Sequence, residues 1–290
     1  EYESVLFSCP PRGCEYSFAN LYLWGRQEVA FLHGCVAFFS HFYGRSLYPY
    51  PIGNGDKKAA IEAILQDAQQ RGIPCRITGM TEADCRLLEK LYPGRFRIYH
   101  DRDGYDYVYH IDDLADLKGR KFQRKRNHVN RFHLLHPRCR LEPLTSANLE
   151  AVQDMATAWY LRRQATDPEG DYHLEQLALL RALADPEKLG MDGLVLLEGE
   201  KILAFSMASR LSPDTMDIHF EKATEGYDGA YAAINQGFAR HLRSKFPQIR
   251  WLNREDDLGI EGLRKAKLSY CPHRLIEKSW ACLKEEGYDC

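Results

Sequence analysis

The sequence predicts a mixed α/β (α+β) protein in which mixed central sheets are flanked by helices. In the second half of the chain, apolar periodicities typical of strands and helices follow the order β-α-α-β-β-β-loop-α-β-α-β, which combines a meander with β-α-β crossovers. In the first half, elements starting near residues 56, 73, 81 and 95 repeat the order of elements starting near 228, 249, 259 and 273. A repeated order at nearly constant spacing indicates two copies of one unit.

The first half is expected to contain strands wherever apolar residues run together between turn signals. These runs are residues 28–32, 35–43, 47–50, 73–78, 95–99 and 105–111. A Pro/Gly loop at 51–55 is followed by Asp56, the expected N-cap of a helix whose apolar positions recur with helical spacing. A second helix is predicted at 81–91.

The second half has the clearer pattern. Strands are predicted at residues 140–144, 193–197, 201–210, 215–222, 248–253 and 273–281. Helices are predicted at residues 147–163, 172–184, 228–245 and 260–268, with Asp228 as the N-cap of the third. This map divides the chain into an N-terminal half (1–111), a basic linker helix (112–138) and a C-terminal half (139–290).

Composition narrows the class of protein. Hydrophobic residues make up 44% and charged residues 28%, values typical of a globular protein. The longest apolar runs are far shorter than the roughly 20 residues that cross a bilayer, so no transmembrane segment is expected. The nine cysteines are odd in number and include no Cys-x-x-Cys pair. They favour a reducing compartment, and the sequence therefore predicts a cytoplasmic protein.

The net charge of −2 conceals one concentrated basic segment. Residues 118–140 contain nine lysines and arginines and no aspartate or glutamate, so the remainder of the chain is net negative. The segment has a narrow apolar seam at Phe122, Val129 and Phe132, which predicts a helix with a largely basic surface.

Three strings carry a resemblance to a known family. They are KGRKFQRKRNHVNRF at 118–132, HFEKA at 219–223 and NREDDLGIEGLRKAK at 253–267. With them, nearly the whole chain resembles an uncharacterised bacterial family related to the C-terminal synthase domain of phosphatidylglycerol lysyltransferase, in the GNAT superfamily of acyltransferases. The resemblance implies a tandem GNAT-like acyltransferase fold. It also implies transfer of an acyl group from acyl-CoA or aminoacyl-tRNA to an amine or hydroxyl acceptor by direct attack.

The resemblance places a coenzyme-binding loop before the helix that starts near residue 228. In GNAT enzymes this loop holds the coenzyme A pyrophosphate, because free N–H groups at a helix N-terminus attract phosphate. The residues expected there are Gly226, Gly229 and Ala230. Glu225 and Asp228 bring negative charge to the same loop, so an ordinary helix start is the alternative.

Catalytic candidates lie on the strand predicted at 215–222. Alternation places Asp217, His219 and Glu221 on one face, and charged side chains are costly to bury in a core. A carboxylate on this strand often serves as general base in GNAT enzymes, with a pKa raised by burial. Glu221 is the first choice for this base and His219 the second. The alternative is a solvated or ion-paired strand face.

Anion and acceptor binding are assigned to two charged segments. In the basic helix, Arg124, Lys125, Arg126 and Asn127 could grip phosphates, and a solvated helix paired with the acidic remainder is the alternative. In the GNAT fold the end of the strand predicted at 248–253 lies opposite Glu221. Acceptor-binding candidates there are Asn253, Arg254 and Glu255, although helix capping explains many of these charges equally well. By position in GNAT enzymes, Tyr270 could return a proton to the leaving group.

Two classes of function follow. The first is an acyl- or aminoacyl-transferase, with acyl-CoA or aminoacyl-tRNA as donor and a small-molecule or amine acceptor. The second is a non-catalytic GNAT-like module that binds an anionic ligand or RNA. No metal is expected, since no familiar metal-binding motif occurs. tRNA is a candidate partner, whereas peripheral lipid contact has no support in the sequence.

Overall fold

The computed structural model describes residues 2–42, 44–168, 170 and 172–284. Its residues form two compact units. The first unit comprises residues up to 106 together with 256–261 and the segment from 275 onward, and the second comprises 107–255 and 262–274. The parts predicted from the sequence were continuous ranges (1–111, 112–138 and 139–290), whereas both observed units are assembled from separated segments.

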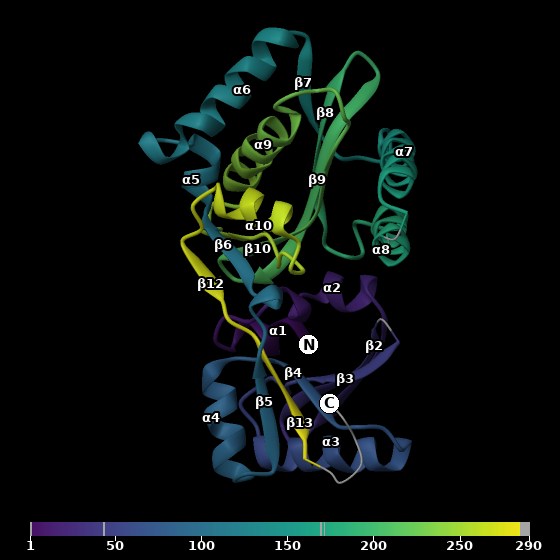
Figure 1. Ribbon diagram of the computed structural model, residues 1–290, viewed down its shortest axis with the longest axis vertical. Coiled ribbons are helices and arrows are strands. Elements are labelled where there is room, and N and C mark those ends of the chain that lie inside the picture. The colour runs from purple at the N-terminus through teal and green to yellow at the C-terminus, as the bar shows by residue number, and fades with distance from the viewer. Residues whose placement is uncertain (1, 43, 169, 171, 285–290) are drawn as a thin grey trace. The chain divides into compact units, whose positions relative to one another are not determined.

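The first unit is built around a six-stranded sheet in the order β1-β2-β3-β4-β13-β5 (Figure 1). Its strands are β1 (Arg26–Leu32), β2 (Cys35–Phe42), β3 (Arg45–Pro49), β4 (Arg76–Met80), β5 (Phe96–His100) and β13 (Ser279–Leu283). Its helices are α1 (Tyr2–Phe7), α2 (Phe18–Leu23), α3 (Lys57–Arg71) and α4 (Glu82–Leu91). β3 and β4 are parallel and the other neighbours are antiparallel, so the sheet is mixed as predicted.

Local sequence signals explain where α3 and α4 begin. The Asp56 side chain accepts a hydrogen bond from the Ala59 N–H at 3.0 Å, which confirms the predicted N-cap of α3. α4 begins with a reciprocal capping box between Thr81 and Asp84. α3 buries Ile61, Ile64 and other apolar side chains in the core of this unit.

The second unit contains a seven-stranded sheet in the order β12-β6-β11-β10-β9-β8-β7. Its strands are β6 (Asp106–His110), β7 (Cys139–Pro143), β8 (Asp192–Glu198), β9 (Lys201–Ser212), β10 (Thr215–Ala223), β11 (Trp251–Asn253) and β12 (Arg274–Ile276). Its helices are α5 (Ile111–Asp116), α6 (Gln123–Leu135), α7 (Leu149–Thr166), α8 (His173–Ala184), α9 (Ala230–Lys245) and α10 (Glu261–Leu268). Figure 1 shows α7 and α8 on one side of this sheet and α5, α6 and α9 on the other.

The two units repeat one topology. In the first, β3-α3-β4-α4-β5 brings β3 and β4 together in parallel, and in the second, β10-α9-β11-α10-β12 does the same for β10 and β11. In each sheet one antiparallel strand is inserted before the last strand: β13 after β4, and β6 after β11. The structure therefore confirms the internal repeat predicted from the order of elements.

Two details of the sequence prediction are wrong. The single strand expected at 273–281 is divided into β12 and β13, which belong to different sheets. The break falls at Lys278, whose ammonium group is buried and bonds to Asp106 at 2.7 Å instead of continuing a strand. Asp228 is not the N-cap of α9, because Gly229 occupies that position and Asp228 lies near Arg131 and His128.

Helix α6 is seated directly on the start of α9. Gly229 has a φ angle of +90°, and a Cβ atom there would lie 2.5 Å from the carbonyl oxygen of His128 and 3.0 Å from the Phe132 Cβ. Phe132 itself is fully buried. Only glycine allows the two helices to approach this closely.

We expect Gly229→Ala to cost much more stability than Gly226→Ala. Both positions have a positive φ, which costs an alanine roughly 1–2 kcal/mol, but Gly226 has open space around it. Only the Gly229 variant must also displace α6, at about 1–3 kcal/mol more. Urea unfolding of both variants, followed by circular dichroism, measures the difference. Equal losses would contradict the proposed contact between α6 and α9.

Candidate functional site

The site lies where β10 and β11 diverge. β10 and β11 pair in parallel only over 215–217 with 251–253, after which β10 continues to Ala223 paired with β9 on its other edge. Glu221 and Arg254 face each other at this point, with Arg254 Nη2 donating to Glu221 Oε1 at 2.8 Å. From α9, Asn235 Nδ2 donates to the other carboxylate oxygen at 3.0 Å. Both oxygens of Glu221 are thus engaged by neighbouring donors.

Arg254 is a nearly buried cation, with a side chain that is 14% exposed. Its guanidinium carbon lies 4.9 Å from the ring centre of Tyr270 and 5.6 Å from that of Tyr109. Burial works against its charge, but the nearby Glu221 carboxylate outweighs that effect and the pKa of Arg254 is raised. Within the described residues, its Nη1 is buried and has no hydrogen-bond partner. Arg254 therefore holds one donor nitrogen that no described acceptor satisfies.

Lys125 brings a second amine from α6 to the same tyrosine. Its Nζ lies 3.8 Å from the ring centre of Tyr270. Burial, followed by the positive charges of Arg254 and Arg124, lowers the pKa of Lys125 to about 8, with Glu221 opposing the shift. Burial also raises the pKa of Tyr270 to about 12, so its phenol keeps its proton at neutral pH. Lys125 can therefore exchange a proton near neutrality, while Tyr270 is a donor.

His219 belongs to a neighbouring but separate network. Its Nε2 lies 2.8 Å from Ser209 Oγ, and its Nδ1 lies 3.2 Å from Glu255 Oε1 and 3.6 Å from Asp217 Oδ2. The side chains of His219 and Asp217 are fully enclosed. Asn253 contributes by accepting a hydrogen bond from the Glu255 N–H at 2.8 Å. Three predicted candidates, His219, Asn253 and Glu255, therefore meet in this network rather than around Glu221.

The other residues of the predicted anion site have different surroundings. Arg126 donates to the carbonyl oxygens of Leu117 and Gly119, so it holds the end of α5. Arg124 and Asn127 are exposed on α6. Lys125 is thus the member of this group that reaches the Glu221 cluster.

In the predicted coenzyme-binding loop before α9, the residues nearest the helix are packed against α6. Gly226 is exposed, whereas Ala230 is fully buried and Gly229 lies beneath the His128 carbonyl group of α6. The carbonyl oxygen of His128 therefore lies close to Gly229, the residue before α9. The coenzyme-binding role of Gly226, Gly229 and Ala230 stays a prediction.

Sequence reasoning missed Asn235 and Tyr109. Asn235 is 5% exposed and lies within the long buried stretch of α9. A polar residue within an otherwise apolar helix face was the available signal, because such a group needs a partner inside the protein. Tyr109 lies in the strand predicted at 105–111, where an aromatic residue is ordinary and gives no signal of a site.

The two units together have a tandem GNAT-like fold. This fold, together with the family reported next, indicates an acyl- or aminoacyl-transferase. The chain belongs to the family described as "Phosphatidylglycerol lysyltransferase, C-terminal", which matches residues 8–282. The resemblance noted in the three strings is therefore confirmed.

Three relatives illustrate the range of similarity. A conserved protein of unknown function from Bacteroides thetaiotaomicron has 36% identity and a TM-score of 0.91, covering 98% of this chain and 95% of that one. The structure of L-PGS from Bacillus licheniformis has 16% identity and a TM-score of 0.68, covering 99% and 92%, and supports the fold alone. An uncharacterised protein from Mycoplasmoides gallisepticum is 25% identical over 178 residues, which are 60% of this chain. The match spans about half the length of that curated relative (54%).

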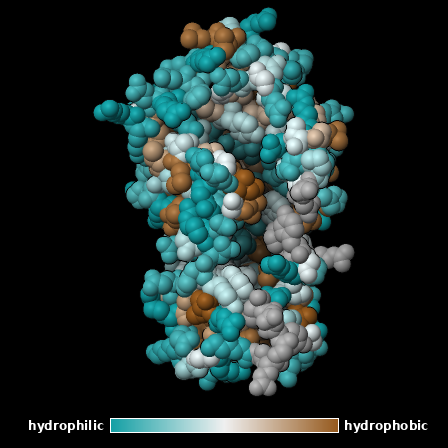
Figure 2. All heavy atoms as spheres, in the orientation of Figure 1, coloured by the Kyte–Doolittle hydropathy of each residue, from teal (hydrophilic) through white to brown (hydrophobic). Residues whose placement is uncertain are grey.

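Among the described helices, none is long and apolar enough to cross a bilayer. On the face shown in Figure 2, hydrophilic residues predominate and hydrophobic residues form small separate patches.

We expect Lys125 to titrate near pH 8 in the folded protein. ¹³C-dimethyl-lysine NMR can follow its pKa, with Lys125→Arg used to assign the signal. Arg254→Met should raise the pKa of Lys125 by removing a neighbouring positive charge, whereas Glu221→Gln should lower it further. The exposed Lys188 serves as an internal control, whose titration should be the same in both variants. A Lys125 signal that titrates with Lys188 would contradict the buried position of its amine.

The lowered pKa of Lys125 also predicts how the stability of the protein depends on pH. The folded protein releases the Lys125 proton near pH 8, whereas an unfolded lysine holds it to about 10.4. The unfolded state therefore binds more protons between these values, and the contribution of Lys125 to stability rises with pH across that window. In urea unfolding at several pH values, Lys125→Met should lose this rise between pH 8 and 10. An unchanged pH dependence would contradict the shift.

Proposed function

We propose that the second unit transfers an acyl or aminoacyl group from an ester-linked donor to an amine or hydroxyl acceptor. The observation that supports this most is the pairing of a buried arginine, with one unpartnered nitrogen, and a lysine whose pKa is about 8. Such a pair offers both a fixed positive charge for a developing oxyanion and a proton acceptor tuned to physiological pH.

Each group has a distinct part in the proposed reaction. The acceptor nitrogen or oxygen attacks the donor carbonyl carbon and gives its proton to neutral Lys125. The carbonyl oxygen takes the electron pair and is stabilised by Arg254 Nη1. When the carbon–oxygen ester bond breaks, the leaving oxygen receives the phenolic proton of Tyr270. Lys125, adjacent to that ring, returns its proton to the phenolate and the cycle closes.

Glu221 fits this scheme as a positioning residue. Its carboxylate oxygens accept hydrogen bonds from Arg254 and Asn235, so it fixes the guanidinium and has no oxygen without a donor. This arrangement favours Lys125 over Glu221 as the proton acceptor. His219, the second base considered from the sequence, is enclosed in its own network with Ser209.

The donor that fits best is aminoacyl-tRNA. The covered start of α9 argues against the usual seat of acyl-CoA, and Asp228 adds negative charge beside it. Helix α6 and the segments next to it present exposed cations that can follow a phosphate backbone, among them Arg120, Arg124 and Arg138. The non-catalytic module considered from the sequence would share this RNA binding but lack transfer.

Binding can separate the two donors. Total bacterial tRNA should raise the melting temperature of the protein, and the effect should weaken as salt increases, whereas acetyl-CoA should leave it unchanged. Arg124→Gln should weaken the tRNA effect, and Lys188→Gln, which removes an exposed cation elsewhere, should not. Stabilisation by acetyl-CoA without any effect of tRNA would overturn the donor assignment.

Catalysis is tested with bacterial tRNA charged with ¹⁴C-labelled amino acids and an extract of small molecules and lipids as the acceptor pool. We expect enzyme-dependent movement of label from tRNA into the extract, at a rate that rises through pH 8. Lys125→Met should lower the rate about 10²–10⁴-fold and abolish that pH dependence. Arg254→Met should lower it about 10²–10³-fold. tRNA binding without transfer would support the binding module instead.

A further inference from the structure

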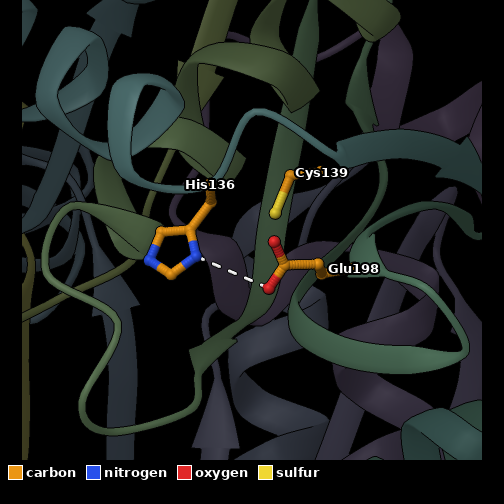
Figure 3. A group of neighbouring side chains, drawn as sticks. All are labelled: His136, Cys139 and Glu198. Carbon is orange, nitrogen blue, oxygen red and sulfur yellow. Dashed lines mark ion pairs between the residues drawn. The ribbon is translucent and has the colours of Figure 1, made fainter.

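A group of metal-binding side chains lies away from the proposed transfer site, at the C-terminal end of α6. His136, Cys139 and Glu198 point toward one another in Figure 3. One ligand atom from each lies within 4.8 Å of the other two. The three residues come from the residue after α6, the first residue of β7 and the last residue of β8.

Local backbone structure fixes this arrangement. The Cys139 N–H donates to the carbonyl oxygen of His136 at 3.1 Å, which closes a turn and brings the two residues to the same place. Cys139 and Glu198 are direct partners in the antiparallel pairing of β7 with β8. The His136 ring is held between Phe132 and Tyr227, each with a ring centre 5.0 Å away. The ligands are therefore gathered before any ion binds.

The geometry points to a Zn²⁺ site formed by His136 Nδ1, Cys139 Sγ and one Glu198 carboxylate oxygen. His136 Nδ1 and Glu198 Oε2 lie 3.5 Å apart. This is longer than a good hydrogen bond, whereas two ligands about 2.0–2.1 Å from zinc in a tetrahedron lie roughly 3.3–3.4 Å apart. Nitrogen, sulfur and oxygen together suit zinc, and the thiol would give its proton to solvent on binding.

Two other clusters of potential metal ligands occur among the described residues, and they differ from this group in how easily an ion could enter them. The side chains of His136 and Glu198 are 21% and 25% exposed, which lets a hydrated ion enter and a water complete the coordination. The cluster of Cys14, Glu15 and Asp106 already contains the Lys278 ammonium group. In the third cluster, around His219, the side chains of His219 and Asp217 are fully buried and only Glu255 is partly exposed.

A bound ion would tie the C-terminal end of α6 to the edge of the sheet. The opposite end of this helix carries Lys125, so the metal would act as a structural clamp for the helix and would take no part in transfer. The inference therefore stands independently of the proposed function, and its test needs no activity.

Cobalt substitution tests the site in the full chain. Wild-type protein should bind Co²⁺ and show a thiolate-to-cobalt charge-transfer band with the intense visible bands of tetrahedral coordination. Cys139→Ser should abolish the charge-transfer band, and Glu198→Gln should weaken metal affinity at least about tenfold. Cys271→Ser is the matched control, because Cys271 is also partly exposed but lies outside the group, and it should leave the spectrum unchanged.

Stability gives a second measurement. Zn²⁺ should raise the melting temperature of the wild type and of Cys271→Ser, but not of Cys139→Ser, and chelation should reverse the effect. Circular dichroism of each variant without metal verifies that it is folded. The inference is overturned if the wild type binds neither Co²⁺ nor Zn²⁺, or if the charge-transfer band survives in folded Cys139→Ser.

Discussion

The approach of α6 to Gly229, the N-cap of α9, is the contact on which the second unit depends. It is possible because Gly229 has no side chain and adopts a backbone conformation that favours glycine. This contact fixes the position of α6, and three parts of that helix then have separate effects. Its N-terminal part delivers Lys125 to Tyr270, its middle covers the start of α9, and its end brings His136 beside Cys139 and Glu198.

Burying charges is expensive, and the two units offset this cost differently. In the first unit, the Lys278 ammonium lies 2.7 Å from Asp106 and 3.2 Å from Glu15, and the pKa of Lys278 is raised well above its usual value. Nearby carboxylates stabilise that charge, which suits a structural role. In the second unit, Arg254 and Lys125 share the single carboxylate of Glu221, so positive charge is left partly uncompensated. Such a site gains stability when negative charge enters it.

The sequence predicted local structure well, and long-range pairing poorly. The N-cap at Asp56 and the repeated order of elements followed from short-range signals that the structure confirms. The division of residues 273–281 between two sheets could not be predicted, because a strand pattern does not identify its partner strand. The single basic linker helix predicted at 112–138 is divided into α5 and α6, because the backbone adopts positive φ angles at Leu117 and Gly119.

The candidate site shows the same limit. Glu221 and Arg254 were named from the sequence, but their hydrogen bond to each other depends on where β10 and β11 stop pairing. Lys125 was one of four candidates in the basic helix and is distinguished from the others by its contact with Tyr270. Residue type suggested that this helix could bind anions, whereas burial and the neighbouring charges of Arg254 and Arg124 lower the pKa of Lys125.

The lowered pKa of Lys125 also couples the two halves of the proposed reaction. Positive neighbours and burial keep the amine partly neutral before attack, which allows it to accept a proton. As the carbonyl oxygen becomes negative beside Arg254, the same electrostatics favour the protonated lysine. Oxyanion formation therefore increases the basicity of the proton acceptor at the stage when a proton must leave the attacking atom. If the carboxylate of Glu221 accepted the proton instead, it would lose the negative charge that holds Arg254 in place.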